Sequence, residues 1–120
     1  MREGRLFHRM KVELPVSLEI EGSNDVFFTT TMDVSVKGLA VKLNRSVEVG
    51  QKFKVAIGTD DNKVVKVDAE VVWMKGAKVE GEGEYVVGFR VIDKMDEDEI
   101  EFVRFVAKKM FEYFKTSSRE

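Results

Sequence analysis

The chain of 120 residues contains no cysteine, one proline and one histidine, and it has no long apolar run. The lack of cysteine excludes disulfides, thiolate catalysis and cysteine–zinc sites, and a lone histidine does not make a convincing metal site. Because no run approaches the ~20 apolar residues of a membrane span, we expect no signal peptide, no membrane insertion and a cytoplasmic protein. This length is typical of a single domain that buries a core without covalent or metal support.

The chain also has little net charge. Charged residues make up 35% of it, but acidic and basic side chains nearly balance to a net charge of −2. This balance argues against non-specific binding to DNA. The first eleven residues differ, because they hold four basic side chains and one acidic side chain. Such a segment suits a small anionic ligand, whereas a duplex needs a broader basic face. No carboxylate stands beside a plausible nucleophile or base in the sequence, so we expect no enzymatic activity.

Alternating apolar and polar residues predict six short strands. The first spans Val12 to Ile20, the second spans Val26 to Val36, and the others occupy residues 39–43, 53–57, 65–73 and 85–91. Residues 75–84, which include three glycines, are expected to form a polar loop. Short strands separated by turn signals are typical of a closed antiparallel β-barrel. The predicted fold class is therefore all-β, a six-stranded barrel followed by one helix.

The second strand carries most of the polar residues of interest. Its even-numbered apolar residues predict the buried face, namely Val26, Phe28, Met32, Val34 and Val36. Because side chains alternate across a strand, Asp33 and Ser35 are expected together on the outward face. Trp73 continues the alternation of the fifth strand, which favours a place in the core over a role as an exposed stacking platform.

The last segment has the signals of a helix from Asp96 to Lys115. Asp96 is a good N-cap with Glu99 as its capping-box partner, and Met95 with Ile100 can form a hydrophobic staple. One apolar stripe contains Ile100, Val103, Ala107, Met110, Phe111 and Phe114, and it is widened by Phe102, Val106 and Tyr113, while Phe105 falls on the polar face. The stripe is wider than one contact needs. We therefore expect the helix to contact both the barrel and a second protein surface, most simply in a homodimer.

Two short motifs stand out by their residue types and spacing. Arg5 and Arg9 form an R-x-x-x-R pair, and Asp33, Ser35 and Gly38 form D-x-S-x-x-G where a strand should turn. Arginine pairs with phosphate oxygens or with guanine O6 and N7, and its plane stacks on purines. A carboxylate accepts from the guanine N–H edge, a hydroxyl donates or accepts, and glycine permits close approach. The plain alternatives are solvated terminal charges for the first motif and turn formers for the second.

Taken together, the motifs and their order resemble the PilZ domain, a bacterial receptor module for cyclic di-GMP. The segments Leu14-Pro15-Val16, Val71-Val72-Trp73 and Val87-Gly88-Phe89-Arg90-Val91 are similar to strands of that family, and the resemblance runs from Arg5 through the helix. It implies a six-stranded barrel with a following helix. It also implies that cyclic di-GMP is bound by Arg5, Arg9, Asp33, Ser35 and Gly38. Gly4 departs from the pattern, because many members carry a further basic residue there.

Two more residues are candidate ligand contacts. His8 lies inside the first motif, where it is either a spacer or a contact, and Arg90 should point outward as a surface charge or a contact. The predicted organisation is a flexible N-terminal arm of residues 1–11 and a barrel domain of residues 12–120 that includes the helix 96–115. No cofactor or metal is expected besides the ligand.

The resulting hypothesis is a non-catalytic bacterial second-messenger receptor. Cyclic di-GMP would order the arm, and a downstream protein of motility, exopolysaccharide synthesis or pilus assembly would recognise the liganded form. One alternative is a PilZ-like interaction domain that needs no ligand. Another is an OB-like binder of single-stranded nucleic acid, which would need basic and aromatic residues interleaved on its strands. The first strand instead presents Glu13, Glu19 and Glu21.

Overall fold

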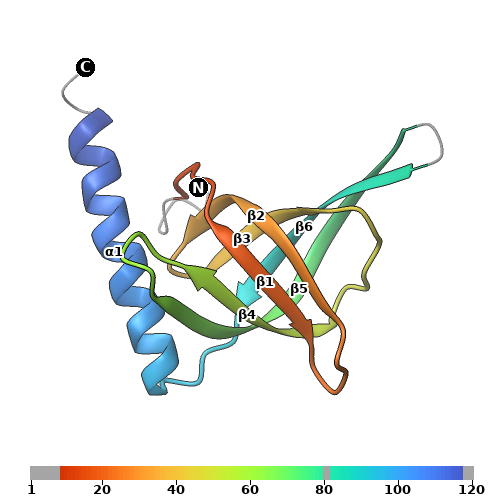
Figure 1. Cartoon of the computed structure of the whole chain (residues 1–120), viewed down its shortest axis with the longest axis horizontal. Coiled ribbons are helices and arrows are strands. Elements are labelled where there is room, and N and C mark those ends of the chain that lie inside the picture. The colour runs from red at the N-terminus through yellow and green to blue at the C-terminus, as the bar shows by residue number, and fades with distance from the viewer. Residues whose placement is uncertain (1–8, 80–81, 118–120) are drawn as a thin grey trace, which may run out of the picture.

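A computed structural model describes residues 9–79 and 82–117. Six antiparallel strands close into a barrel in the order β1-β2-β3-β6-β5-β4, and one helix follows them (Figure 1). This arrangement confirms the predicted fold class. The elements are β1 (Pro15–Ile20), β2 (Val26–Ser35), β3 (Gly38–Leu43), β4 (Lys52–Gly58), β5 (Val64–Val79), β6 (Glu82–Val91) and α1 (Glu97–Ser117).

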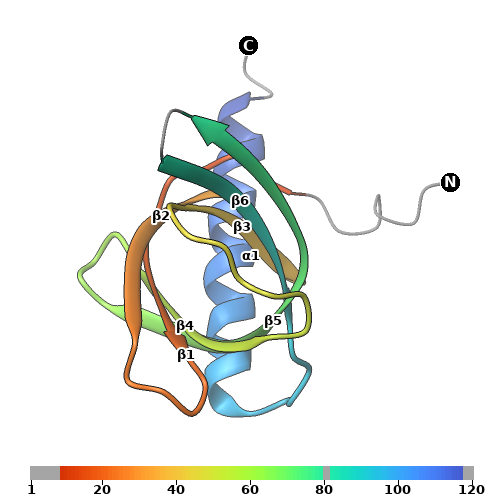
Figure 2. The same cartoon turned by 90° about the vertical axis from the view of Figure 1, so that its right-hand side faces the viewer.

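The barrel interior is filled by apolar side chains from all six strands. Phe53 of β4 is almost completely buried, and its ring centroid lies 5.3 Å from that of Phe89 and 6.4 Å from that of Phe27. The Phe53 and Phe89 rings meet nearly at right angles, which is a favoured aromatic arrangement. Because the sheet closes on itself, each strand is paired on both sides, and the barrel has no free edge along its body (Figure 2).

β5 and β6 are longer than the sequence pattern predicted. They remain paired as far as Val79 and Glu82, so the segment expected to be a polar loop is mostly a hairpin. This hairpin projects beyond the body of the barrel (Figure 1). The alternation signal fails here because residues 75–84 are charged or glycine apart from Ala77 and Val79, so they give no alternating apolar pattern.

The predicted faces of β2 are wrong for its first half. The pairing register with β3 shifts at Met32, and this extra residue reverses the alternation of side chains. Thr31 is buried and Val34 is buried, whereas Val26 is exposed and Phe28 is 81% exposed. A single bulge therefore moves the N-terminal apolar residues of this strand from the interior to the surface.

Trp73 is also outside the barrel core, contrary to the expectation. A second register shift lies between Val71 and Trp73, and the tryptophan side chain is 40% exposed. Its indole ring lies against Gly88 of the neighbouring strand. A Cβ on that glycine would come within 2.2 Å of Trp73 Cε2. The ring therefore lies over a position that any larger residue would fill.

The chain joins the barrel before β1 begins. Met10 is buried, and its N–H and C=O exchange hydrogen bonds of 2.9 and 3.0 Å with Val34. The hydroxyl of Thr31 accepts a bond from Leu14 N–H and donates one to the Val12 carbonyl. Residues 10–14, which include the last two residues of the predicted arm, are thus held against β2. The rest of that arm, apart from residue 9, lies outside the described residues.

The N-terminus of α1 follows the predicted capping scheme in part. Glu99 N–H donates to Asp96 Oδ1 at 2.9 Å, which confirms the N-cap. The Glu99 carboxylate accepts from the N–H groups of Lys94 and Met95, two residues and one residue before the cap. Met95 has a φ of 59° and is exposed, so it does not form the expected staple with Ile100.

α1 packs against the barrel along β5 with one part of the predicted stripe, mainly the residues that widen it. Phe102 and Val106 are completely buried, and the side chains half-buried against the core are Val103, Phe105, Met110 and Tyr113. Phe105 was expected on the polar face, and that expectation was wrong. Lys109 forms an ion pair with Asp60 in the turn between β4 and β5, which attaches the middle of the helix to the barrel.

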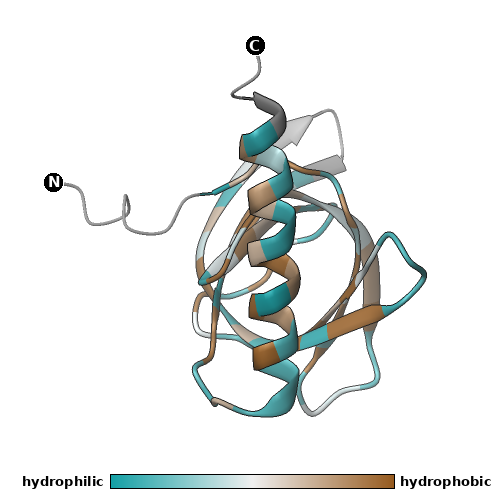
Figure 3. Ribbon diagram, turned by 90° about the vertical axis from the view of Figure 1, so that its left-hand side faces the viewer, coloured by the Kyte–Doolittle hydropathy of each residue, from teal (hydrophilic) through white to brown (hydrophobic). Residues whose placement is uncertain are grey.

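The opposite side of α1 remains apolar and uncovered. Ile100, Phe111 and Phe114 of the predicted stripe are all exposed, with Phe111 at 68%. Apolar segments recur among hydrophilic ones along the helix, viewed in Figure 3 from the side away from the barrel. In the part of the chain that the structure describes, no helix is long and apolar enough to span a membrane.

Candidate ligand-binding site

The structure brings together one residue from each sequence motif. Arg9 Nε donates to Asp33 Oδ1 at 3.0 Å, and Arg9 Nη2 lies 2.8 Å from the same oxygen. Met10 and Val34 pair with each other and point inward, so their neighbours Arg9 and Asp33 point to the outer surface. The two side chains are 46% and 25% exposed. This pair presents an arginine fork and a carboxylate at one place on the outside of the barrel.

Ser35 does not present a free hydroxyl to solvent, contrary to the expectation. Its side chain is 1% exposed, and its Oγ accepts from Lys37 N–H at 3.1 Å and donates to the Gly38 carbonyl at 3.4 Å. A serine that bonds the backbone two residues ahead is a common way to fix a tight turn. The serine therefore shapes the connection between β2 and β3.

Gly38 is required by the packing of two strands. It pairs with Arg90 of β6, and a Cβ at this position would lie 2.2 Å from the Phe89 carbonyl oxygen. Because the obstructing atom belongs to the backbone, no side-chain rearrangement could relieve the contact. The glycine thus allows the β2–β3 turn to lie close against β6.

Arg90 occupies the outer face of β6, as expected. It stands opposite Gly38 in the pairing of β3 with β6. Its Nη2 lies 2.5 Å from Glu70 Oε1 on β5, and its side chain is about half exposed. The arginine is therefore near the motif but is engaged by a carboxylate.

Trp73 lies in the same row of the barrel wall as Asp33, which the sequence analysis missed. Asp33 pairs with Ala40, Ala40 with Gly88, and Gly88 with Trp73. Neighbouring strands are about 4.8 Å apart, so the backbones of Asp33 and Trp73 are separated by roughly 14 Å. The indole covers Gly88, which brings it across part of that separation. The available signal was an aromatic residue and a glycine in neighbouring predicted strands.

Arg5 and His8 lie outside the described residues, so their predicted contacts stay predictions. Across residues 9–79 and 82–117 the structure contains no cluster of three or more His, Asp or Glu side chains placed to hold a metal ion.

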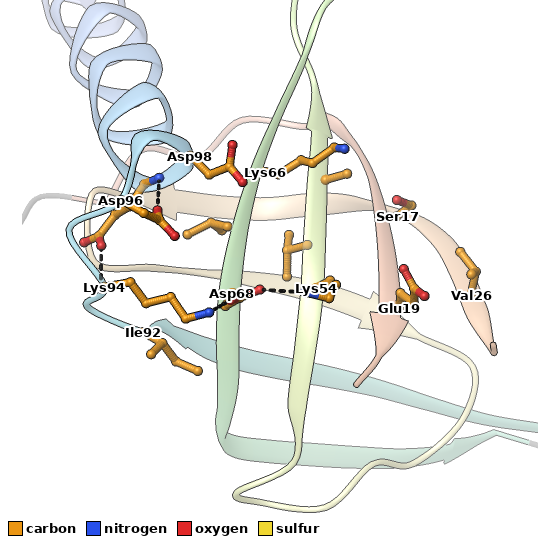
Figure 4. Close-up of a pocket in the computed structure, with 14 residues that line it drawn as sticks. Ser17, Glu19, Val26, Lys54, Lys66, Asp68, Ile92, Lys94, Asp96 and Asp98 are labelled. Carbon is orange, nitrogen blue, oxygen red and sulfur yellow. Dashed lines mark hydrogen bonds and ion pairs between the residues drawn. The ribbon is translucent and has the colours of Figure 1, made fainter. Parts of the chain in front are cut away.

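A separate hollow of about 180 Å³ lies where α1 begins against β4 and β5 (Figure 4). Lys94 and Lys54 both pair with Asp68 at its centre, the second at 3.7 Å. The hydrogen bond with Asp68 raises the pKa of Lys94. Asp96 and Asp98 add further negative charge to the rim. Two of its three lysines are paired with Asp68, and it contains no residue of either motif.

Comparison with known proteins identifies the family. The model of the PilZ domain matches residues 3–108, so the chain belongs to the PilZ domain family. No curated protein matches the sequence.

Solved structures share the fold at low sequence identity. The PilZ domain of YcgR from Escherichia coli, solved with c-di-GMP, has a TM-score of 0.70 and 15% identity over 95% of this chain and 97% of that one. MrkH from K. pneumonia in its apo state has a TM-score of 0.74 and 12% identity over 99% of this chain and 54% of that one. The PilZ domain of CeSA from a cellulose-synthesizing bacterium has a TM-score of 0.63 and 19% identity over 86% of this chain and 98% of that one. The chain thus spans about half of the longer matched proteins, such as MrkH.

Proposed function

We propose that this protein is a non-catalytic receptor for cyclic di-GMP, and that Arg9 and Asp33 are the centre of its binding site. Membership of the PilZ family and the fold shared with YcgR and PlzA, both solved with c-di-GMP, support the ligand. The observation that carries the proposal is the contact between Arg9 and Asp33, which lie 24 positions apart and come from the two motifs.

The Arg9–Asp33 pair is suited to exchange its internal contact for contacts with the ligand. An exposed ion pair contributes only about 0–1 kcal/mol, so its separation costs little. Arg9 can then bind a phosphate or the O6 and N7 atoms of a guanine, and Asp33 can accept from the N1–H and N2–H₂ groups. Hydrogen bonds to charged groups contribute about 1.5–3 kcal/mol each, which exceeds the loss.

The other motif residues are assigned different roles. Ser35 and Gly38 fix the β2–β3 turn beside the charged pair, so they position the site and offer backbone groups to the ligand. Arg5 is proposed as the second ligand-binding arginine. His8 and Arg90 are proposed as secondary contacts, and Arg90 must first leave Glu70.

Trp73 is proposed as an aromatic platform for one guanine. Its ring lies on the outer surface in the same row as Asp33, with Gly88 beneath it. Stacking of a base on an aromatic side chain is worth about 1–3 kcal/mol. The chain contains one tryptophan, so a ligand-dependent change in tryptophan fluorescence can be assigned to this position.

Calorimetric titration of the whole chain tests the proposal. Cyclic di-GMP should bind in preference to GTP, cyclic AMP or a single-stranded oligonucleotide. Arg9→Ala and Asp33→Ala should each weaken binding by at least about tenfold while thermal melts barely change, because both side chains lie on the outer surface of the barrel and not in its core. Arg104→Ala is the matched control, since this exposed arginine lies on α1. An absence of heat at high micromolar ligand, or normal binding by Arg9→Ala, would overturn the proposal.

The same titrations separate the alternatives. Binding of neither ligand nor oligonucleotide would favour an interaction domain that needs no ligand. Preferential binding of the oligonucleotide would favour the OB-like alternative. A titration with duplex DNA addresses the prediction that the protein does not bind DNA.

Signalling is proposed to proceed by ordering of the N-terminal arm, which a downstream protein then recognises. Arg9 and Met10 contact β2 through Asp33 and Val34, so the change is assigned to residues 2–8. Hydrogen exchange in these amides should slow with saturating cyclic di-GMP. The Met10 amide, bonded to the Val34 carbonyl, is the internal reference and should be protected in both states. Equal exchange of residues 2–8 with and without ligand would refute arm ordering while leaving the binding site intact.

A further inference from the structure

α1 has two apolar sides, and only one of them contacts the barrel. The buried side contains Phe102 and Val106. The other side carries the exposed residues Ile100, Ala107, Phe111 and Phe114, which recur at spacings of seven, four and three residues. These spacings align side chains along one line of a helix. The line from the first to the last of them is about 21 Å long, at 1.5 Å per residue.

We propose that this exposed line binds the same line of a second copy, with the two helices antiparallel. The charge distribution along α1 carries the orientation. Its first five residues include Glu97, Asp98, Glu99 and Glu101, and the rest carries four basic residues, Arg104, Lys108, Lys109 and Lys115, against one acidic residue, Glu112. Parallel helices would place acid against acid. Antiparallel helices place the acidic half of each copy against the basic half of the other, and they also oppose the helix dipoles.

Ala107 sets the register of the pair. It lies seven residues from Ile100 and seven from Phe114, so a two-fold axis at Ala107 places Ile100 of one copy opposite Phe114 of the other. A small side chain at the crossing point allows the helix axes to approach to about 8 Å. The same register places Arg104 against the Phe111 ring of the other copy, a favourable cation–π arrangement.

Glu97 and Lys115 form the charged edge of this pairing. At 100° per residue, both lie on the same side of the apolar line, and the two-fold axis brings Glu97 of one copy next to Lys115 of the other. Each dimer contains this contact twice. The helix carries all of these groups, so the proposal does not depend on the binding of cyclic di-GMP.

Sedimentation equilibrium of the full chain without ligand is the first test. The wild-type protein should dimerise, and Phe111→Ser should weaken the dimer by at least about tenfold through the loss of apolar contact. Phe28→Ser is the matched control, because it removes an exposed phenylalanine from β2 and should leave the dimer unchanged. Thermal melts verify that both variants fold. A wild-type protein that remains monomeric at about 1 mM overturns the proposal, as does equal weakening by both variants.

Charge reversal tests the orientation. Lys115→Glu and Glu97→Lys should each weaken self-association by about threefold to tenfold, because each replaces two attractive contacts with two repulsive ones. An equimolar mixture of the two variants should restore dimerisation, since acid again faces base at both ends. Charge reversals that leave the dimer as strong as wild type, or a mixture that fails to recover, would overturn the antiparallel arrangement.

Discussion

The hydroxyl of Thr31 is the buried polar group on which the entry of the chain into the barrel depends. Its Oγ1 accepts from Leu14 N–H at 2.9 Å and donates to the Val12 carbonyl at 2.6 Å, and Thr31 N–H donates to the Leu14 carbonyl at 2.9 Å. Thr31→Val keeps the shape of the side chain but removes the hydroxyl. The buried Leu14 N–H is then left without a hydrogen-bond acceptor, and the carbonyl of the half-buried Val12 loses a hydrogen-bond donor.

The magnitude follows from those two groups. A buried donor left without a partner costs about 1–3 kcal/mol, and the carbonyl, which is closer to solvent, adds less. We expect Thr31→Val to lower the free energy of unfolding by about 2–3 kcal/mol. For a domain of this size that corresponds to a decrease in Tm of about 6–15 °C. Arg9 should also be positioned less well, because the segment that leads from it to β1 is held by these bonds.

Urea and thermal denaturation of Thr31→Val and Thr31→Ser provide the measurement. Serine retains the hydroxyl and loses only a methyl group, so it separates the hydrogen bonds from the packing. We expect the valine variant to be the less stable of the two. A valine variant that is as stable as the serine variant would refute the reasoning, because it would mean that the two bonds contribute nothing net.

Three further changes test other parts of the structure. Gly38→Ala should lower the free energy of unfolding in urea by about 1–3 kcal/mol, because its Cβ meets the Phe89 carbonyl; unchanged stability would contradict the close approach. Phe102→Ala should lower the free energy of unfolding by about 3–5 kcal/mol in the same assay, since this ring of α1 is completely buried against the barrel. A decrease below ~1 kcal/mol would contradict that packing. Lys94 has a raised pKa through its hydrogen bond with Asp68, so its contribution is present at neutral pH and is lost as the pH rises through that pKa. The Tm difference between wild type and Lys94→Gln should therefore shrink in strongly alkaline solution, and a constant difference would exclude the ion pair as its cause.

The barrel and the helix were predictable because their signals are local. Alternation over five or more residues marks a strand with one buried face, and Asp96 marks the start of α1 through its own side chain. The positions of the bulges were not predictable by the same reasoning. Met32 looks like any other apolar strand residue, yet its insertion reverses the faces of β2 and exposes Phe28.

The sequence also left the covered side of the helix and the contact at the site undetermined. The sequence predicted an apolar stripe on α1, but a helix with two apolar sides does not reveal which side the barrel covers, and Phe102 marks the covered side. Family resemblance brought Arg9 and Asp33 into one prediction. Their contact depends on the pairing of Met10 with Val34. Met10 lies before the first strand that the alternation of apolar residues could detect.

The four motif residues that the structure describes divide into two groups with different consequences for mutation. Arg9 and Asp33 pair with each other on the outer surface of the barrel, so their removal should affect ligand binding and leave stability almost unchanged. Ser35 and Gly38 are buried in the turn, so their removal should lower stability and affect binding only through the geometry of that turn. Loss of binding in a Ser35 or Gly38 variant is therefore not evidence of ligand contact unless the variant remains fully folded at the temperature of the assay. Affinity measured alongside denaturation for all four variants separates residues that touch the ligand from residues that hold the turn in place.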